Sequence, residues 1–172
     1  MSKTSLIVAQ LEDIEAMEKV RKKCIKETYQ NLLTKEQVEC LASQEPNPLN
    51  LEKHIGKGTV YLLKDDPKTS LEGYAYMKFT PRSGENGVCT IEGIYPSKKA
   101  LEEGIFERHL AAIENTVKEA GCYKMKGVAT KPELEILKKF GYTESAPSYR
   151  HTREGVTINY YPFSKTLYFP EM

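Results

Sequence analysis

Glu92 is the residue of this sequence best placed to move a proton. It lies inside the apolar run 88–95, whose alternation predicts a strand. Loss of hydration on such a strand raises the pKa of a carboxyl group, and a raised pKa suits a general base. The alternative is a glutamate on the polar face of the strand, paired with a cation. The sequence leaves both interpretations open.

The cysteines and histidines do not form a recognisable site. The cysteines include no C-x-x-C pair and the histidines are scattered, so no metal is expected. Reduced, partly buried thiols are the simpler interpretation. His109 is expected on a helix face, whereas His151 on a late strand is a candidate for facing a pocket. The residues concerned are Cys24, Cys40, Cys89, Cys122, His54, His109 and His151.

The composition is that of an ordinary globular protein. The chain has 172 residues, 40% of them hydrophobic and 28% charged, which predicts a single domain over 1–172. Lys plus Arg is 25 and Asp plus Glu is 24, so the basic excess of nucleic-acid binders is absent. No stretch resembles a targeting segment or approaches the ~20 apolar residues of a membrane span. We expect a cytoplasmic protein with neither nucleic acid nor membrane as a partner.

The N-terminal third predicts a strand followed by a helical arm over 11–55. Apolar spacing indicates a strand at 5–9 and a helix at 11–28. Thr34 and Gln37 have the spacing of a capping box, which predicts a second helix from 34 to 43. After a loop with two prolines, Asn50 is expected to cap a short helix at 51–55.

The remaining segments complete a mixed α/β fold of the α+β kind. Strands are predicted at 59–64, 73–80, 88–95 and 123–129, with a long helix at 100–120, a shorter one at 131–139 and a closing hairpin over 148–167. Gly155 supplies the positive φ that the hairpin turn needs. The order is β-α-α-β-β-β-α-β-α-β-β, with a central sheet and two helical crossovers.

These segments together resemble the GNAT N-acetyltransferases almost from end to end. The similar stretches are the helix pair within 20–38, the strand 71–76, the strand, loop and helix from Cys89, the corner at 139–142, and the hairpin 153–167. The order and spacing of these stretches carry the resemblance. It implies an enzyme that transfers acetyl from acetyl-CoA to a primary amine of a small molecule or peptide. The alternative is a GNAT-fold protein without this activity that acts as a binding or regulatory module.

The resemblance places the phosphates of acetyl-CoA at the start of the long helix, where backbone N–H groups are free. The family pattern is Arg or Gln, two residues, Gly, one residue, then Gly or Ala. The matching stretch 101–106 keeps only Gly104, and it carries Glu102 and Glu103 where phosphates would approach. The implied cofactor-binding residues are Ile94, Tyr95, Lys98, Lys99, Gly104, Ile105 and Phe106.

The resemblance also assigns the catalytic roles. It implies Glu92 as the base, acting on the amine. The usual acid is a tyrosine four residues before the corner glycine, and here that position is Leu137. Tyr142 and Tyr149 are the candidates to replace it, with Tyr160 and Tyr161 as alternatives.

Two further expectations concern the backbone and the C-terminus. If the family geometry holds, the strands 88–95 and 123–129 separate, and the pantetheine arm of acetyl-CoA pairs with the backbone between them. The apolar C-terminal stretch 168–170 favours packing or a contact in a homodimer.

Overall fold

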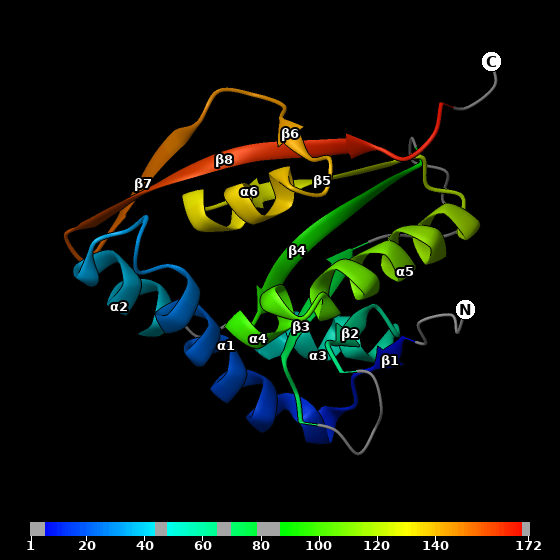
Figure 1. Ribbon diagram of the computed structural model, residues 1–172, viewed down its shortest axis with the longest axis horizontal. Coiled ribbons are helices and arrows are strands. Elements are labelled where there is room, and N and C mark those ends of the chain that lie inside the picture. Colours follow the sequence, from blue (N-terminus) through cyan, green and yellow to red (C-terminus); the bar gives the residue numbers. More distant parts are fainter. Residues whose placement is uncertain (1–5, 44–47, 65–69, 79–86, 170–172) are drawn as a thin grey trace.

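The computed structural model of the protein describes residues 6–43, 48–64, 70–78 and 87–169 (Figure 1). Its strands are β1 (Ile7–Val8), β2 (Val60–Leu62), β3 (Gly73–Lys78), β4 (Val88–Pro96), β5 (Lys124–Ala129), β6 (Thr143–Glu144), β7 (Tyr149–Arg153) and β8 (Val156–Thr166). Its helices are a 3-10 turn η1 (Leu11–Asp13), α1 (Ile14–Thr28), α2 (Lys35–Ser43), α3 (Pro48–Gly56), α4 (Lys98–Glu102), α5 (Ile105–Glu119) and α6 (Lys131–Lys138).

The strands form one mixed, mostly antiparallel sheet, as the sequence predicts. Its order is β1-β2-β3-β4-β5-β8-β6, and β7 pairs with β8 off this path. The central pair β4–β5 is parallel, so its connection must cross the sheet, and α5 makes that crossing. The expected second crossover is also present, because α6 leads from β5 to β6, and these two strands run parallel since both pair antiparallel with β8.

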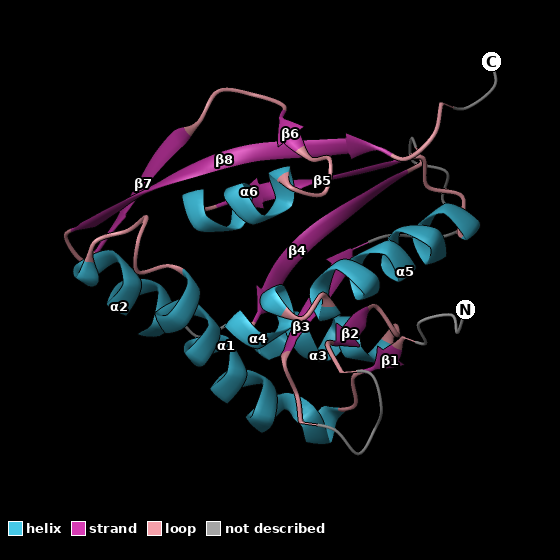
Figure 2. Ribbon diagram, in the orientation of Figure 1, coloured by secondary structure: helices cyan, strands magenta, loops and turns pink. Residues whose placement is uncertain are grey.

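Helices cover both faces of the sheet (Figure 2). On one face, α5 and α6 pack on alternate residues of the central strands, which include Cys89, Ile91 and Met125. On the other face, α1 and α3 pack on β2 and β3 through Val60, Leu62 and other buried side chains. The amphipathic stripes of the helices therefore build two cores that the sheet separates.

The predicted long helix at 100–120 is interrupted. Gly104 has a φ of +74°, a left-handed conformation that ends α4 and begins α5. The hydroxyl of Ser97 accepts a hydrogen bond from the backbone N–H of Ala100, and this contact caps α4. Gly104 therefore ends one helix and begins the next.

Two local predictions at turns and caps are confirmed, and one is wrong. Thr34 and Gln37 exchange the two hydrogen bonds of a capping box before α2. Glu154 and Gly155 both have positive φ values in the β7–β8 turn. The third helix begins at Pro48 instead of after Asn50, since proline suits a first helical turn.

Within the described ranges, none of the helices is both long and apolar enough to traverse a lipid bilayer. The predicted turn at 81–87 and the end of the strand predicted at 73–80 lie mostly outside the described residues.

Candidate active site

Strands β4 and β5 separate halfway along their length. Their parallel pairing runs from Val88 opposite Lys124 to Ile91 opposite Gly127 and ends there. β4 continues to Pro96 with β3 on its other side, so residues 92–96 have no strand beside them on the β5 side. Unpaired strand edges offer N–H and C=O groups to an extended ligand. The expected separation of these two strands is confirmed.

Glu92 lies at the point where the two strands separate. The register against β3 shifts here, because Tyr76 pairs with Gly93 and Met77 pairs with Ile91, which leaves Glu92 as the extra residue of a bulge. Its side chain is exposed on the face opposite α5 and α6, so the expected loss of hydration on the apolar strand is wrong and Glu92 lies on the polar face. A pocket of about 400 Å³ opens beside it, lined by Thr90, Ile91, Glu92, Lys126, Gly127, Val128, Ser145, Pro162 and Phe163. A carboxylate is thus presented to a pocket at the end of the strand pairing.

Gly127 is required at the point of separation because the neighbouring atoms approach it closely. A Cβ at this position would lie 2.6 Å from the Phe163 ring and 2.8 Å from the Ile91 carbonyl oxygen. We therefore expect Gly127→Ala to reduce the free energy of unfolding by about 1–3 kcal/mol, as overpacking does. Denaturant unfolding measures this change.

Gly56→Ala is the matched control for Gly127→Ala. A Cβ at Gly56 would meet nothing within 4 Å, so its stability should change by no more than about 1 kcal/mol and in the stabilising direction. Equal stability of the Gly127 variant and the wild type would show that the strands can move apart at no cost.

The loop after β4 presents a helix start together with charges of both signs. Helix α5 begins at Ile105, so its first N–H groups lack partners within the helix. Glu102 forms an exposed ion pair with Lys98 at 3.8 Å, which partly offsets its charge. Arg108 donates a hydrogen bond to the Glu103 carbonyl oxygen at 3.4 Å and so holds a cation near Gly104. The sequence reasoning missed Arg108, although its place one turn after Gly104 is visible.

Phe106 does not obstruct this loop. Its side chain is 1% exposed and meets the ring of Phe140 edge-on, with the ring centroids 5.6 Å apart. The ring therefore fills the core between α5 and the end of α6. Ile94 lies in the same core, whereas Tyr95 lies on the opposite face against Tyr74.

The two candidate tyrosines lie away from Glu92. Tyr142 is buried on the α5 side of the sheet, and its hydroxyl donates a hydrogen bond of 2.8 Å to Glu114. Burial, together with the Glu114 carboxylate, raises the pKa of Tyr142 far above its ordinary value. Tyr149 is half-exposed on β7, where its ring stacks on Tyr160. Neither residue lines the pocket beside Glu92.

The buried thiols are poor nucleophiles. Burial raises the pKa of Cys24 to about 12 and raises the pKa of Cys89 further still. Nowhere in the described ranges do three or more His, Cys, Asp or Glu side chains gather as metal ligands would. His109 is fully buried, and His151 lies exposed on β7.

A second group of polar side chains, Glu133, Thr130 and Tyr29, lies near the C-terminal ends of β4 and β5. Glu133 is in the first turn of α6, and its carboxylate accepts a hydrogen bond of 2.9 Å from the Thr130 hydroxyl. Burial raises the pKa of Glu133 to about 7, while hydrogen bonding to Thr130 and Tyr29 opposes the rise. The sequence reasoning missed this residue, although Thr-x-x-Glu at 130–133 has the spacing of a capping box.

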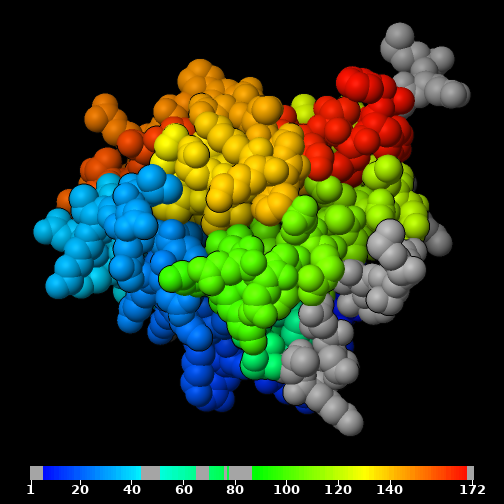
Figure 3. Space-filling model, viewed as in Figure 1, coloured from blue at the N-terminus to red at the C-terminus, as the bar shows by residue number. Residues whose placement is uncertain are grey.

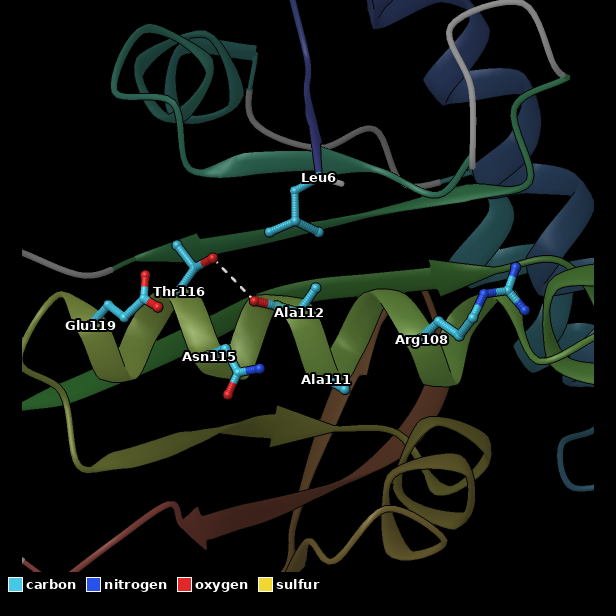
Figure 4. Close-up of a pocket in the computed structure, with 7 residues that line it drawn as sticks. All are labelled: Leu6, Arg108, Ala111, Ala112, Asn115, Thr116 and Glu119. Atoms are coloured by element: carbon cyan, nitrogen blue, oxygen red, sulfur yellow. Dashed lines mark hydrogen bonds between the residues drawn. The ribbon is translucent and has the colours of Figure 1, made fainter. Parts of the chain in front are cut away.

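Another groove runs along the outer face of α5 but brings no reactive groups together. It measures about 360 Å³ and is lined by Leu6, Arg108, Ala111, Ala112, Asn115, Thr116 and Glu119 (Figure 4). The Thr116 hydroxyl is bonded back to the Ala112 carbonyl oxygen within the helix. Arg108 and Glu119 lie at opposite ends of the row, so their charges do not converge on one ligand atom.

Solved structures resemble this chain over nearly its whole length. A GCN5-related N-acetyltransferase from Rhodopseudomonas palustris matches with a TM-score of 0.75 and 16% identity, covering 97% of this chain and 98% of that one. The paia N-acetyltransferase of Thermoplasma acidophilum, solved in complex with coenzyme A, matches with a TM-score of 0.69 and 14% identity over 94% and 98%. The ribosomal-protein-S18-alanine N-acetyltransferase of Escherichia coli matches with a TM-score of 0.68 and 8% identity, covering 97% of this chain and 96% of that one.

No protein-family model matches the sequence, and no curated protein does either. At identities of 8–16% the structural likeness establishes the fold. The protein therefore has the fold of the GNAT N-acetyltransferases, as its sequence pattern predicts.

Proposed function

We propose that this chain, with the fold of the GNAT N-acetyltransferases, transfers acetyl from acetyl-CoA to a primary amine of a small molecule or peptide. The observation that carries the proposal is the separation of β4 and β5 beside Glu92. An open strand edge next to an exposed carboxylate suits a reaction between an extended thioester and an amine. The neighbour from Thermoplasma acidophilum, which was solved with coenzyme A, has the same fold and supports this choice of donor.

The backbone of β4 is the proposed holder of the thioester arm. The pantetheine part of acetyl-CoA contains two amide groups, which can pair with the free edge of residues 92–96 as an added strand would. Ile94 and Tyr95 lie in this stretch. Since this pairing uses main-chain groups, it does not depend on the altered side chains of the following loop.

The start of α5 is the proposed site of the pyrophosphate. The first N–H groups of a helix and the positive end of its dipole favour an anion. The left-handed Gly104 ends α4 just before them, and Lys98, Lys99 and Arg108 supply positive charge nearby. Glu102 and Glu103 act against binding, and we expect them to weaken it.

Glu92 is the proposed base, because it faces the pocket in which an amine can approach the thioester. Its carboxylate accepts a proton from the ammonium form, directly or through a water molecule. The freed nitrogen lone pair then attacks the acetyl carbonyl carbon. The C–S bond breaks when the C–N bond is complete, and the departing thiolate requires a proton.

Calorimetric titration with acetyl-CoA, followed by an assay of thiol release with a panel of primary amines, tests the proposal. The panel includes alkyl monoamines, diamines, amino-acid amides and tripeptides with a free N-terminus. We expect micromolar binding and amine-dependent release of the thiol. Absence of binding at millimolar acetyl-CoA would overturn the proposal and favour a GNAT-fold binding module.

Arg108→Gln is expected to weaken acetyl-CoA binding roughly fivefold, because an exposed charge pair contributes up to about 1 kcal/mol. The loss should shrink as salt is added, since added ions screen the charge of the guanidinium. Lys118→Gln is the matched control, because it removes one exposed cation from the other end of α5. Equal losses in both variants would mean that Arg108 contributes only to overall charge.

A further inference from the structure

We propose that Glu133 donates the proton that the departing thiolate takes up, so that it replaces the tyrosine absent at Leu137. The inference rests on the proposed acetyl transfer and assigns its second proton transfer. It starts from a carboxyl group that belongs to neither the Glu92 pocket nor the phosphate loop.

The neighbours of Glu133 connect it with the end of β4. It projects from α6, which packs on one face of the sheet, and its neighbour Tyr29 belongs to the cluster of α1, α2 and β8. Tyr29 also interacts with Tyr95, and the Cys24 thiol donates to the carbonyl oxygen of Pro96, both at the end of β4. Side chains from the two faces can meet only where no paired strand lies between them.

The space-filling view agrees with this placement. In Figure 3 the surface of α1 and α2, in blue, meets the surface of α6, in yellow. The gap seen between these ribbons in Figure 1 is therefore filled by side chains. The segments that carry Tyr29 and Glu133 therefore lie against each other.

The helix geometry relates Glu133 to the position where an acid is missing. Residues four apart lie on the same face of a helix, so Glu133 is one turn before Leu137 on α6. Leu137 is fully buried and cannot supply a proton. The carboxyl group of Glu133 is the nearest acid on that face of the helix, because Glu135 points outward to Lys131 and Lys138.

The surroundings of Glu133 suit an acid that must also regain its proton. Burial favours the neutral form, whereas the hydroxyls of Thr130 and Tyr29 stabilise the carboxylate left after donation. Tyr29 is 1% exposed, so its hydroxyl is held in the interior beside the Glu133 carboxyl group. The other titratable groups that interact with Glu133 are Cys24 and Tyr160, and neither carries a charge at neutral pH.

Glu92 passes the proton of the ammonium group on to solvent, and the nitrogen then loses its second proton to Glu92 as its bond to the acetyl carbon forms. The C–S bond breaks and its electron pair goes to sulfur. The sulfur takes the proton of the neutral Glu133 carboxyl group, leaving a free thiol and a carboxylate, which is reprotonated from solvent before the next turnover.

The simplest alternative is that Glu133 only caps α6. Glutamine serves equally well at the third position of a capping box, so Glu133→Gln keeps the cap and removes the acid. Equal thermal unfolding of variant and wild type in the absence of ligand, at a pH below 5, would show that the cap is intact. This variant therefore separates the two roles.

The experiment compares two acetyl donors, acetyl-CoA and an S-acetyl nitrothiophenol. The alkyl thiolate of coenzyme A resembles that of cysteine, whose pKa is near 8.5, and needs a proton at neutral pH. A nitrothiophenolate is stable without one. We expect Glu133→Gln to lower kcat for acetyl-CoA by about 10²-fold or more and to change turnover of the aryl thioester by less than roughly threefold. With acetyl-CoA, kcat of the wild type should fall above about pH 7, and the variant should lose this dependence.

Glu135→Gln is the matched control, because it changes an exposed glutamate on the same helix. An unchanged kcat for acetyl-CoA in Glu133→Gln, in an active wild type, would overturn the acid role and leave the proposed function standing. Equal losses with both donors would assign Glu133 a structural role and overturn the proposal. A wild type that neither binds nor turns over acetyl-CoA would remove both inferences together.

Discussion

Glu92→Gln is expected to lower kcat/KM for amine acetylation by a factor of about 10²–10⁴, the usual contribution of a positioned general base. The amide has nearly the shape of the carboxylate but cannot accept the proton of an ammonium group. Because Glu92 is exposed on a bulge, the change should leave the stability of the fold nearly unaffected. Thiol release at several amine concentrations separates kcat from KM.

Glu119→Gln provides the control for the loss of one negative charge, since it lies exposed at the far end of α5. Raising the pH increases the fraction of free amine in solution and should partly restore the Glu92 variant. A Glu92 variant with the activity of the wild type would mean that the amine reaches the thioester already neutral, without help from this residue.

Glu133→Gln is expected to change how stability depends on pH. The pKa of Glu133 is about 7 in the folded protein, against 4.5 for an ordinary glutamate. The folded state therefore binds more protons than the unfolded state between these two values, and the free energy of unfolding falls as pH rises. The neutral carboxyl group contributes fully below about pH 4.5, and its contribution is lost as pH rises through about 7.

The glutamine variant should lack this loss. From about pH 4.5 to about pH 8, the wild type should lose up to roughly 3 kcal/mol relative to Glu133→Gln, which is the shift converted at 1.36 kcal/mol per pKa unit. Denaturant unfolding at a series of pH values measures the difference, in which the contributions of other groups cancel. Parallel curves for the two proteins would show that Glu133 has the same pKa in the folded and unfolded states and would also argue against its role as an acid.

The two carboxylates divide the proposed chemistry between them. Glu92 is exposed at the point where the strand pairing ends, and Glu133 is half-buried in the first turn of α6. Loss of hydration favours the neutral form of a carboxyl group, which can donate a proton. Two glutamates can thus take opposite roles, Glu92 as base and Glu133 as acid, because the fold leaves Glu92 in contact with water and removes water from Glu133.

The sequence alone determined the elements and their order. Apolar spacing predicts the segments of α1, α2, α6 and the main strands, and capping and turn residues such as Thr34 and Gly155 predict several of their ends. Those signals are local, because a helix end or a hairpin turn depends on a few neighbouring residues. The order and spacing of the elements also carry the resemblance to the GNAT family, and that resemblance singles out Glu92 and Gly104.

Tertiary structure decided which groups meet and which are hydrated. Tyr142 was a candidate acid by its place in the sequence, but packing ties its hydroxyl to Glu114, a residue 28 positions away. Phe106 stands where the family pattern has Gly or Ala, and only the packing shows that its ring turns into the core against Phe140. Glu133 reads as a simple helix cap until the separation of β4 and β5 places it against Tyr29. Burial and charge at a site depend on distant segments brought together by folding, and local spacing does not report them.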